Sequence, residues 1–148
     1  MDIQHDFKEL LALLNARHVE FLIVGGYALA FHGAPRYTGD IDLFIRPTQE
    51  NAARVLAALN AFGFHFPNLS EKDFTNPDQV VQLGVPPVRI DLMTSISGVS
   101  WDEANASKVS GLYGDVPVYY IGLKEYIVNK KASGRQKDLA DIEALDEP

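Results

Sequence analysis

The sequence predicts an α/β fold in which helices flank a mixed β-sheet. In the first half, short apolar runs at 21–24 and 41–45 alternate with segments whose apolar residues recur at helical spacing, as in proteins that alternate strands and helices. In the second half, turn residues at 84–87 and 113–115 each separate two apolar runs, which indicates hairpins. Hairpins add antiparallel strands, so we expect the sheet to be mixed.

The first half is predicted to form three helices and two strands. Leucines three or four positions apart indicate the first helix. Gly33 and Pro35 are suited to stop the second helix, and Thr48 is suited to cap the third. In chain order, the expected helix, strand, helix, strand and helix cover 7–17, 21–24, 26–32, 41–45 and 49–61.

The second half is predicted to begin with an irregular loop, 67–78, and to end with two helices. Ser133 and Gln136 have the spacing of a capping box for the last helix. The two hairpins are expected to pair 80–83 with 88–93 and 108–112 with 116–121, and the closing helices to cover 123–131 and 136–145.

Composition limits the class of protein. The 148 residues are 47% hydrophobic and 22% charged, as expected for a single globular domain covering 1–148. There is no cysteine, so disulfides and thiolate metal sites are excluded. The chain starts with polar residues and has no apolar run near the roughly 20 residues of a membrane span, so we expect a soluble, cytoplasmic protein. The net charge of −7 argues against a broad nucleic-acid-binding surface.

Two carboxylates stand one residue apart at the start of the second predicted strand. Successive side chains of a strand point to opposite faces, so Asp40 and Asp42 project together while Ile41 enters the core. Adjacent carboxylates repel each other unless a hard cation lies between them. Upstream, Gly25 and Gly26 close the first strand and open a helix, where bare backbone N–H groups favour an anion. A cation site beside an anion site is what a metal–nucleotide complex requires.

This order of motifs resembles the nucleotidyltransferase superfamily of polymerase-beta type, and especially its small bacterial members of the minimal and abortive-infection types. Their pattern is a strand ending in two small residues, a helix, Asp-x-Asp on the next strand, and a third acidic residue on a later strand. Here Asp91, in the segment 88–93, is the natural third carboxylate. The resemblance covers 21 to about 145 and implies the nucleotidyltransferase fold. It also implies that Asp40, Asp42 and Asp91 are catalytic ligands of Mg²⁺ or Mn²⁺.

Arg36 and Thr38 precede the carboxylate pair, at positions where small bacterial relatives carry similar residues. The guanidinium of Arg36 is suited to phosphate oxygens, but it could equally neutralise Asp40 or Asp42. The Thr38 hydroxyl could bond a phosphate or the strand backbone.

Basic residues gather near the end of the acidic chain, from 124 to 137. The segment 130–142 is similar to the Lys…Arg-x-Lys-Asp-x-x-Asp ending of the same small families. Lys130 or Lys137 could reach the β- and γ-phosphates of a nucleotide. The alternative is an ion-paired helix whose apolar residues pack inward.

The resemblance leads to two functional hypotheses. The first is an Mg²⁺-dependent nucleotidyltransferase that moves NMP from an NTP, such as ATP, to a hydroxyl of an RNA, a protein or a small molecule. Relatives occur in bacterial toxin–antitoxin and defence modules, so a partner protein is possible. The second is a catalytically silent module that binds a nucleotide or neutralises a partner on the same fold.

Overall fold

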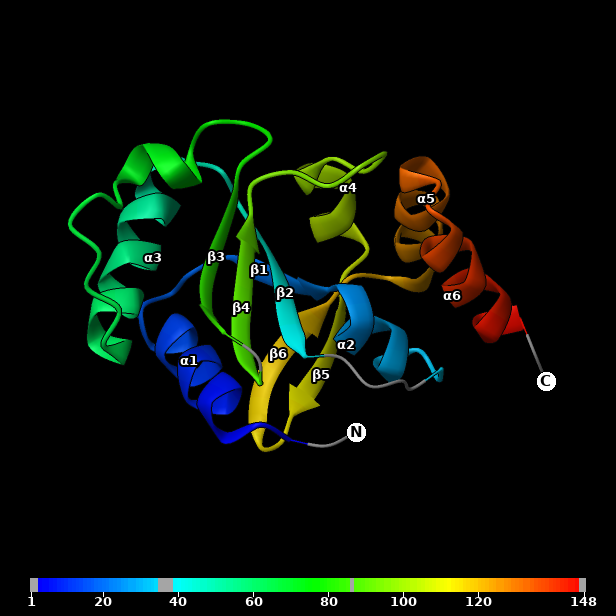
Figure 1. Ribbon diagram of the computed structural model, residues 1–148, viewed down its shortest axis with the longest axis horizontal. Helices are drawn as coiled ribbons and strands as arrows, with labels where there is room; N and C mark the ends of the chain where they lie inside the picture. The colour runs from blue at the N-terminus through cyan, green and yellow to red at the C-terminus, as the bar shows by residue number, and fades with distance from the viewer. Residues whose placement is uncertain (1–2, 35–38, 86, 147–148) are drawn as a thin grey trace.

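The computed structural model describes residues 3–34, 39–85 and 87–146. A six-stranded sheet runs through it, with strand order β3-β4-β2-β1-β6-β5 (Figure 1). β2 is parallel to β4 and β1 is parallel to β6, while the other neighbours are antiparallel. The predicted mixed sheet is therefore confirmed. Its strands are β1 (Phe21–Val24), β2 (Asp40–Ile45), β3 (Val80–Val85), β4 (Val88–Met93), β5 (Val109–Tyr113) and β6 (Val116–Tyr120).

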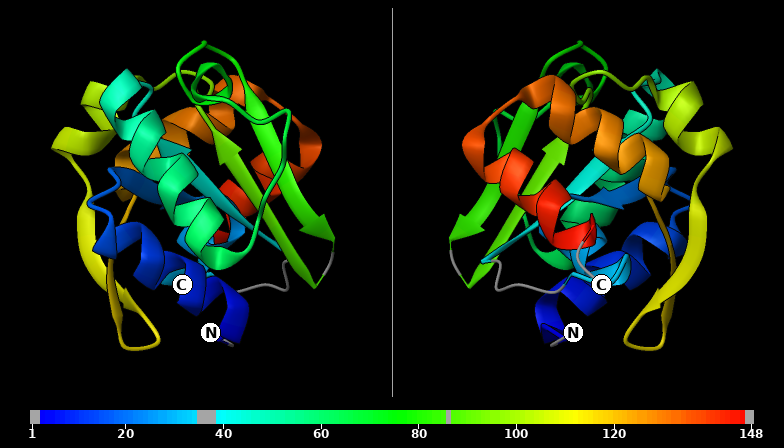
Figure 2. Two further views of the ribbon diagram at one scale, coloured as in Figure 1. Left: turned by 90° about the vertical axis from the view of Figure 1, so that its left-hand side faces the viewer. Right: turned by 90° about the vertical axis from the view of Figure 1, so that its right-hand side faces the viewer.

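Helices cover both faces of this sheet. In Figure 2, α1 and α3 lie in front of the strands in one view, and α5 and α6 lie in front of them in the opposite view. Leucines of α1 and Val55 and Leu59 of α3 are buried in the core. None of the helices in the described ranges is long and apolar enough to cross a membrane. The helices are α1 (His5–Ala16), α2 (Gly25–Phe31), α3 (Gln49–Phe62), α4 (Trp101–Ala106), α5 (Leu123–Ser133) and α6 (Gln136–Asp146).

The local signals at the first strands and at α3 have the expected effect. Thr48 caps α3, because its side chain accepts a hydrogen bond from the backbone N–H of Asn51 at 3.3 Å. All four residues of β1 are buried, which suits an interior strand with helices on both faces. In β2, Ile41 and Leu43 are fully buried while Asp40 and Asp42 remain half-buried on the other face.

Three details of the second half differ from the sequence-based expectation. The stretch 67–78 is not wholly irregular: a 3-10 helix (Glu71–Phe74) forms there because the fully buried Phe74 anchors it. Helix α4 was not predicted, although the side chains of Ser100 and Glu103 form a reciprocal capping box at its start. The capping box expected at Ser133 is wrong, because Ser133 ends α5 and its hydroxyl donates to Asp138 at 2.8 Å.

Candidate active site

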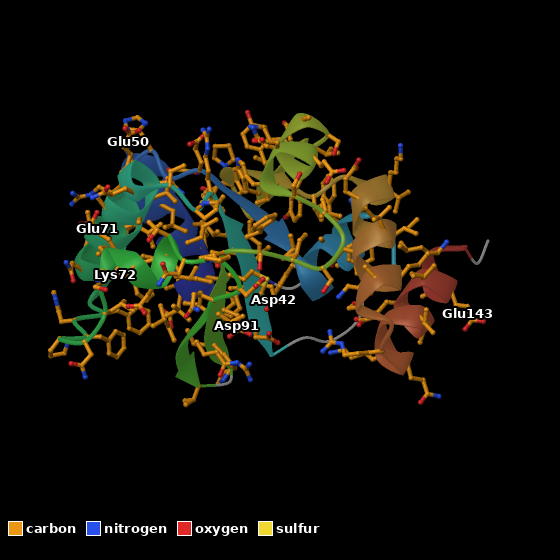
Figure 3. The ribbon with its side chains drawn as sticks, turned by 90° about the horizontal axis from the view of Figure 1, so that it is seen from above. Asp42, Glu50, Glu71, Lys72, Asp91 and Glu143 are labelled. Carbon is orange, nitrogen blue, oxygen red and sulfur yellow. The ribbon has the colours of Figure 1, made fainter. Side chains whose placement is uncertain are left out.

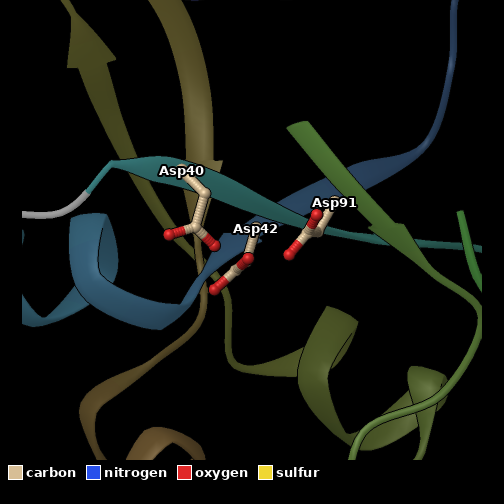
Figure 4. Close-up of side chains that lie close together, drawn as sticks. All are labelled: Asp40, Asp42 and Asp91. Atoms are coloured by element: carbon tan, nitrogen blue, oxygen red, sulfur yellow. The ribbon is translucent and has the colours of Figure 1, made fainter. Parts of the chain in front are cut away.

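Three carboxylates from two neighbouring strands meet on one face of the sheet. β2 and β4 are parallel and in a register that sets Asp42 beside Asp91, while Asp40 lies two residues away on the same face. One carboxylate oxygen from each of these residues lies within 4.8 Å of the others, and Figure 4 shows the three groups directed toward one another. Seen from above, Asp42 and Asp91 lie near the middle of the molecule, with the C-terminal helices to their right (Figure 3).

The electrostatics of this cluster suit a hard cation. Burial raises the pKa of Asp42 to about 8, and a side-chain hydrogen bond with Asp40 and the negative charges of Asp40 and Asp91 act in the same direction. The positive charge of Lys130 opposes the rise. Carboxylate oxygens are the ligands that Mg²⁺ and Mn²⁺ prefer, so the donor set fits such an ion.

The raised pKa predicts a pH-dependent response to metal. A carboxyl group whose pKa is higher in the folded than in the unfolded chain contributes stability below its ordinary range near 4 and loses that contribution as the pH rises toward 8. A divalent cation removes this penalty by binding the ionised form. Mg²⁺ at tenfold its Kd at pH 8 should raise the melting temperature by about 4 °C at pH 8, and the same concentration should raise it much less at pH 5. Calorimetric scans with and without metal at both pH values would check this, and an equal shift at both would contradict it.

The third carboxylate also has a basic partner. The guanidinium of Arg89 binds Asp91 through two hydrogen bonds, Nε to Oδ1 and Nη2 to Oδ2, each 3.1 Å long. Arg89 precedes Asp91 by two residues on the same strand, so alternation puts both side chains on one face. The pair partly offsets the negative charge of the cluster. Arg89 was not predicted as a site residue, although it stands two positions before Asp91 in the sequence.

The double glycine lies directly beside the carboxylates, because Val24 pairs with Asp42 in the sheet. Gly25 has a left-handed backbone, with φ of 67°. A Cβ atom at this position would overlap Oδ2 of Asp42. Gly25 therefore leaves room for the carboxylate, whereas Gly26 has the ordinary helical backbone of α2. Gly25 is thus the glycine whose missing side chain makes room for Asp42, and the anion contact expected of both glycines stays a prediction.

Gly25→Ala should disrupt the candidate metal site as well as strain the backbone. The left-handed conformation costs an alanine about 1–2 kcal/mol, and the added methyl group must also displace Asp42. Gly63→Ala is a matched control, since Gly63 also has a positive φ but nothing lies within 4 Å of its Cβ position. We expect both variants to be destabilised, while only Gly25→Ala weakens Mn²⁺ binding at least tenfold, about 1.4 kcal/mol. Calorimetric titration would measure this, and equal Mn²⁺ affinities would assign Gly25 a backbone role alone.

A cavity of about 430 Å³ opens beside the carboxylates. Gly25 and Asp42 lie on its floor at the sheet, and Lys130 and Arg135 line it from α5 and the turn that follows. Positive groups thus share one cavity with Asp42, one of the candidate metal ligands, as the charges of a metal-bound triphosphate require.

The two basic groups are held in place by a buried carboxylate. The Asp138 side chain is fully buried and accepts hydrogen bonds from Lys130 Nζ at 3.2 Å, Ser133 Oγ at 2.8 Å and Arg135 Nε at 2.7 Å. Burial alone would raise the Asp138 pKa, but the bonds from Arg135 and Ser133 and the charge of Lys130 outweigh it and hold that pKa well below its usual range. This cluster joins α5 to α6.

The structure thus brings together most, but not all, of the site residues predicted from sequence. Lys130 lines the cavity, whereas Lys137 is exposed and lies outside its lining. Arg36 and Thr38 fall outside the described residues. Arg135 and Asp138 were not selected as site residues, although both stand in the same Arg-x-Lys-Asp motif that drew attention to Lys137.

The family described as "Nucleotidyl transferase of unknown function (DUF2204)" matches residues 3–147. The chain belongs to this family. This nucleotidyltransferase has the mixed sheet and the paired carboxylates that its sequence motifs predicted. Its predicted membership of the nucleotidyltransferase superfamily is confirmed. No curated protein matches it in sequence.

Solved structures of other proteins share the fold of this nucleotidyltransferase. A putative nucleotidyltransferase from Thermotoga maritima has a TM-score of 0.61 at 16% identity, covering 94% of this chain and 87% of its own. The lincomycin-bound lincosamide antibiotic adenylyltransferase LnuA has a TM-score of 0.61 at 14% identity, covering 99% of both chains. An antigenic nucleotidyltransferase-like protein from Paracoccidioides brasiliensis has a TM-score of 0.53 at 17% identity, covering 97% of this chain and 75% of its own.

Proposed function

We propose that this protein transfers NMP from a Mg²⁺- or Mn²⁺-bound NTP to an acceptor hydroxyl. The observation that carries the proposal is the convergence of Asp40, Asp42 and Asp91 beside a cavity that also holds Lys130 and Arg135. Asp40, Asp42 and Asp91 would hold the metal, which supplies Lewis-acid stabilisation of charge on the reacting phosphate.

The other residues of the site have different roles in the proposed reaction. Lys130 and Arg135 bind the β- and γ-phosphates, because they are the cations that face the carboxylates across the cavity. Gly25 keeps the floor free of a side chain beside Asp42. The acceptor oxygen then forms a bond to the α-phosphorus while the bond to pyrophosphate breaks, and Asp91 takes the hydroxyl proton. Arg36, Thr38 and Gly26 remain predicted phosphate contacts. Lys137 also remains one, although it lies outside the cavity lining.

The acceptor class is part of this proposal. RNA, protein and small-molecule hydroxyls all remain predictions, and the lincomycin-bound fold neighbour supports testing small molecules first. An association with a toxin–antitoxin module and a partner protein also remain predictions from the resemblance.

The direct test follows the label of each α-³²P NTP in the presence of Mg²⁺ or Mn²⁺ with bacterial RNA, protein or a small-molecule extract. The proposal requires label from the α-position, but not from the γ-position, to appear on an acceptor, and requires EDTA to prevent it. An α-label that stays in free nucleotide with every acceptor would reject transfer.

One observation favours the silent binding module as a second candidate. Arg89 engages both oxygens of Asp91, so Asp91 must partly exchange this partner to bind a cation and accept a proton. Nucleotide binding without turnover in wild type, with turnover appearing in Arg89→Met, would favour this second function.

A further inference from the structure

The cavity continues beyond the carboxylate cluster to the edge of the sheet. Along the order β1-β2-β4-β3, its lining passes from Gly25 and Asp42 to residues at the start of β3 and the end of β4. At that end the cavity is lined by Asp78, Val80, Met93, Ser95, Ile96 and Ser97. None of these six residues is basic or aromatic, so this end offers a phosphate no cation and a nucleobase no ring for stacking.

Asp78 is the charged group at this end. Its Oδ1 accepts a hydrogen bond from the Ser95 hydroxyl at 2.7 Å, which joins the segment before β3 to the segment after β4. Asp78 has a left-handed backbone, with φ of 57°, a conformation that aspartate adopts more readily than most residues. Among the residues that the structure describes, no basic side chain pairs with Asp78.

The two ends of the cavity carry different charges, so they favour different ligands. Lys130 and Arg135 face Asp42 and suit the polyanionic triphosphate. A carboxylate that has neighbouring hydroxyls but no ion pair with a described basic side chain repels a second phosphate and attracts a cation or a hydroxyl donor. The net charge of −7 also disfavours the binding of a polyanionic acceptor. A cavity of about 430 Å³ is of a size that accommodates small molecules.

We propose that the Asp78 end of the cavity receives the acceptor, and that the acceptor is a small hydroxyl-bearing amine whose ammonium group binds Asp78. This inference rests on the proposed nucleotidyl transfer and selects one acceptor class among the three. Val80, Met93 and Ile96 provide an apolar wall for its carbon skeleton, and Ser95 and Ser97 provide hydroxyl groups for its polar substituents.

The binding test uses matched pairs that differ in one amine: N-methylglucamine with sorbitol, and glucosamine with glucose. Each is titrated into protein saturated with Mg²⁺ and α,β-methylene-ATP, which blocks cleavage at the α-phosphorus, and affinity is followed by backbone NMR shifts. We expect at least one amine to bind about tenfold or more tightly than its neutral partner, since a hydrogen bond to a charged group contributes about that factor. Asp78→Asn should remove the difference and change the nucleotide Kd less than twofold. Asp102→Asn, which alters an exposed carboxylate of α4 outside the cavity, should retain it.

Three results would overturn the inference. The first is equal affinity for amine and neutral partner throughout the panel, and the second is tighter binding of an RNA oligonucleotide than of any amine. The third is a loss of nucleotide affinity in Asp78→Asn as large as its loss of amine affinity, which would assign Asp78 to the nucleotide. Label transfer separates the two proposals. Asp78-dependent amine binding without transfer of α-label would reject the catalytic function and support the recognition site.

Discussion

Asp42→Asn is expected to abolish nucleotidyl transfer while stabilising the metal-free protein at pH 8. Asparagine has nearly the same shape but lacks the charge with which Asp42 would bind a metal together with Asp40 and Asp91. Metal ions contribute several kcal/mol to stabilising charge on the reacting group, so the turnover rate should fall about 10³-fold or more.

The gain in stability follows from the raised pKa of Asp42. At pH 8 the folded protein must either ionise a buried carboxyl group beside two others or keep it protonated at a cost, and burial is the largest cause of that cost. Asparagine is neutral at every pH, so the variant should melt a few degrees higher than wild type at pH 8 without metal. At pH 4 the two should melt at similar temperatures, because Asp42 is then protonated in the folded protein.

Two measurements check this prediction: label transfer at saturating NTP, and thermal melts in EDTA across pH 4–8. Asp102→Asn provides the control for loss of one exposed negative charge. Turnover within tenfold of wild type in a folded Asp42→Asn protein would remove Asp42 from the catalytic role. A variant less stable than wild type at pH 8 would show that Asp42 is ionised and well compensated without metal.

Asp138→Ala should have the largest effect on stability. It removes the carboxylate that Lys130, Ser133 and Arg135 share, and it leaves the buried Lys130 ammonium without its partner. Breaking a buried ion pair from one side costs about 3–5 kcal/mol. The loosened Lys130 and Arg135 should also bind the triphosphate less tightly.

Urea denaturation would measure the loss, and Lys137→Ala in the same helix is the control. Lys137 is exposed and outside the cavity lining, so its replacement should change the free energy of unfolding by less than about 0.5 kcal/mol. Because the Asp138 pKa is lowered, its contribution exists above the ordinary range of an aspartate and disappears on acidification. The difference between wild type and Asp138→Ala should therefore narrow at low pH. A difference below 1 kcal/mol at neutral pH would show that the Asp138 cluster contributes little to holding α5 and α6 together.

Local signals predicted much of the fold. Strand alternation correctly placed Asp40 and Asp42 on one face with Ile41 in the core, and Thr48 does cap α3. Where such signals competed, prediction failed: Ser133 has the spacing of an N-cap, but its hydroxyl bonds the buried Asp138 and it ends α5 instead. The tertiary contact outweighed the local preference.

By itself, the sequence determined the fold class, the first strands, the hairpins and the candidate metal ligands, because strand periodicity and motif order depend on near neighbours in the chain. Only the tertiary structure decided which of several similar residues share a site. The register of β2 on β4 sets Asp42 beside Asp91, and the pairing of Val24 with Asp42 brings Gly25 against the Asp42 carboxylate. The last turn of α5 and the residue after Gly134 bring Lys130 and Arg135 to the cavity, whereas Lys137 lies outside its lining. Each of these outcomes depends on packing between elements far apart in sequence, which local periodicity does not encode.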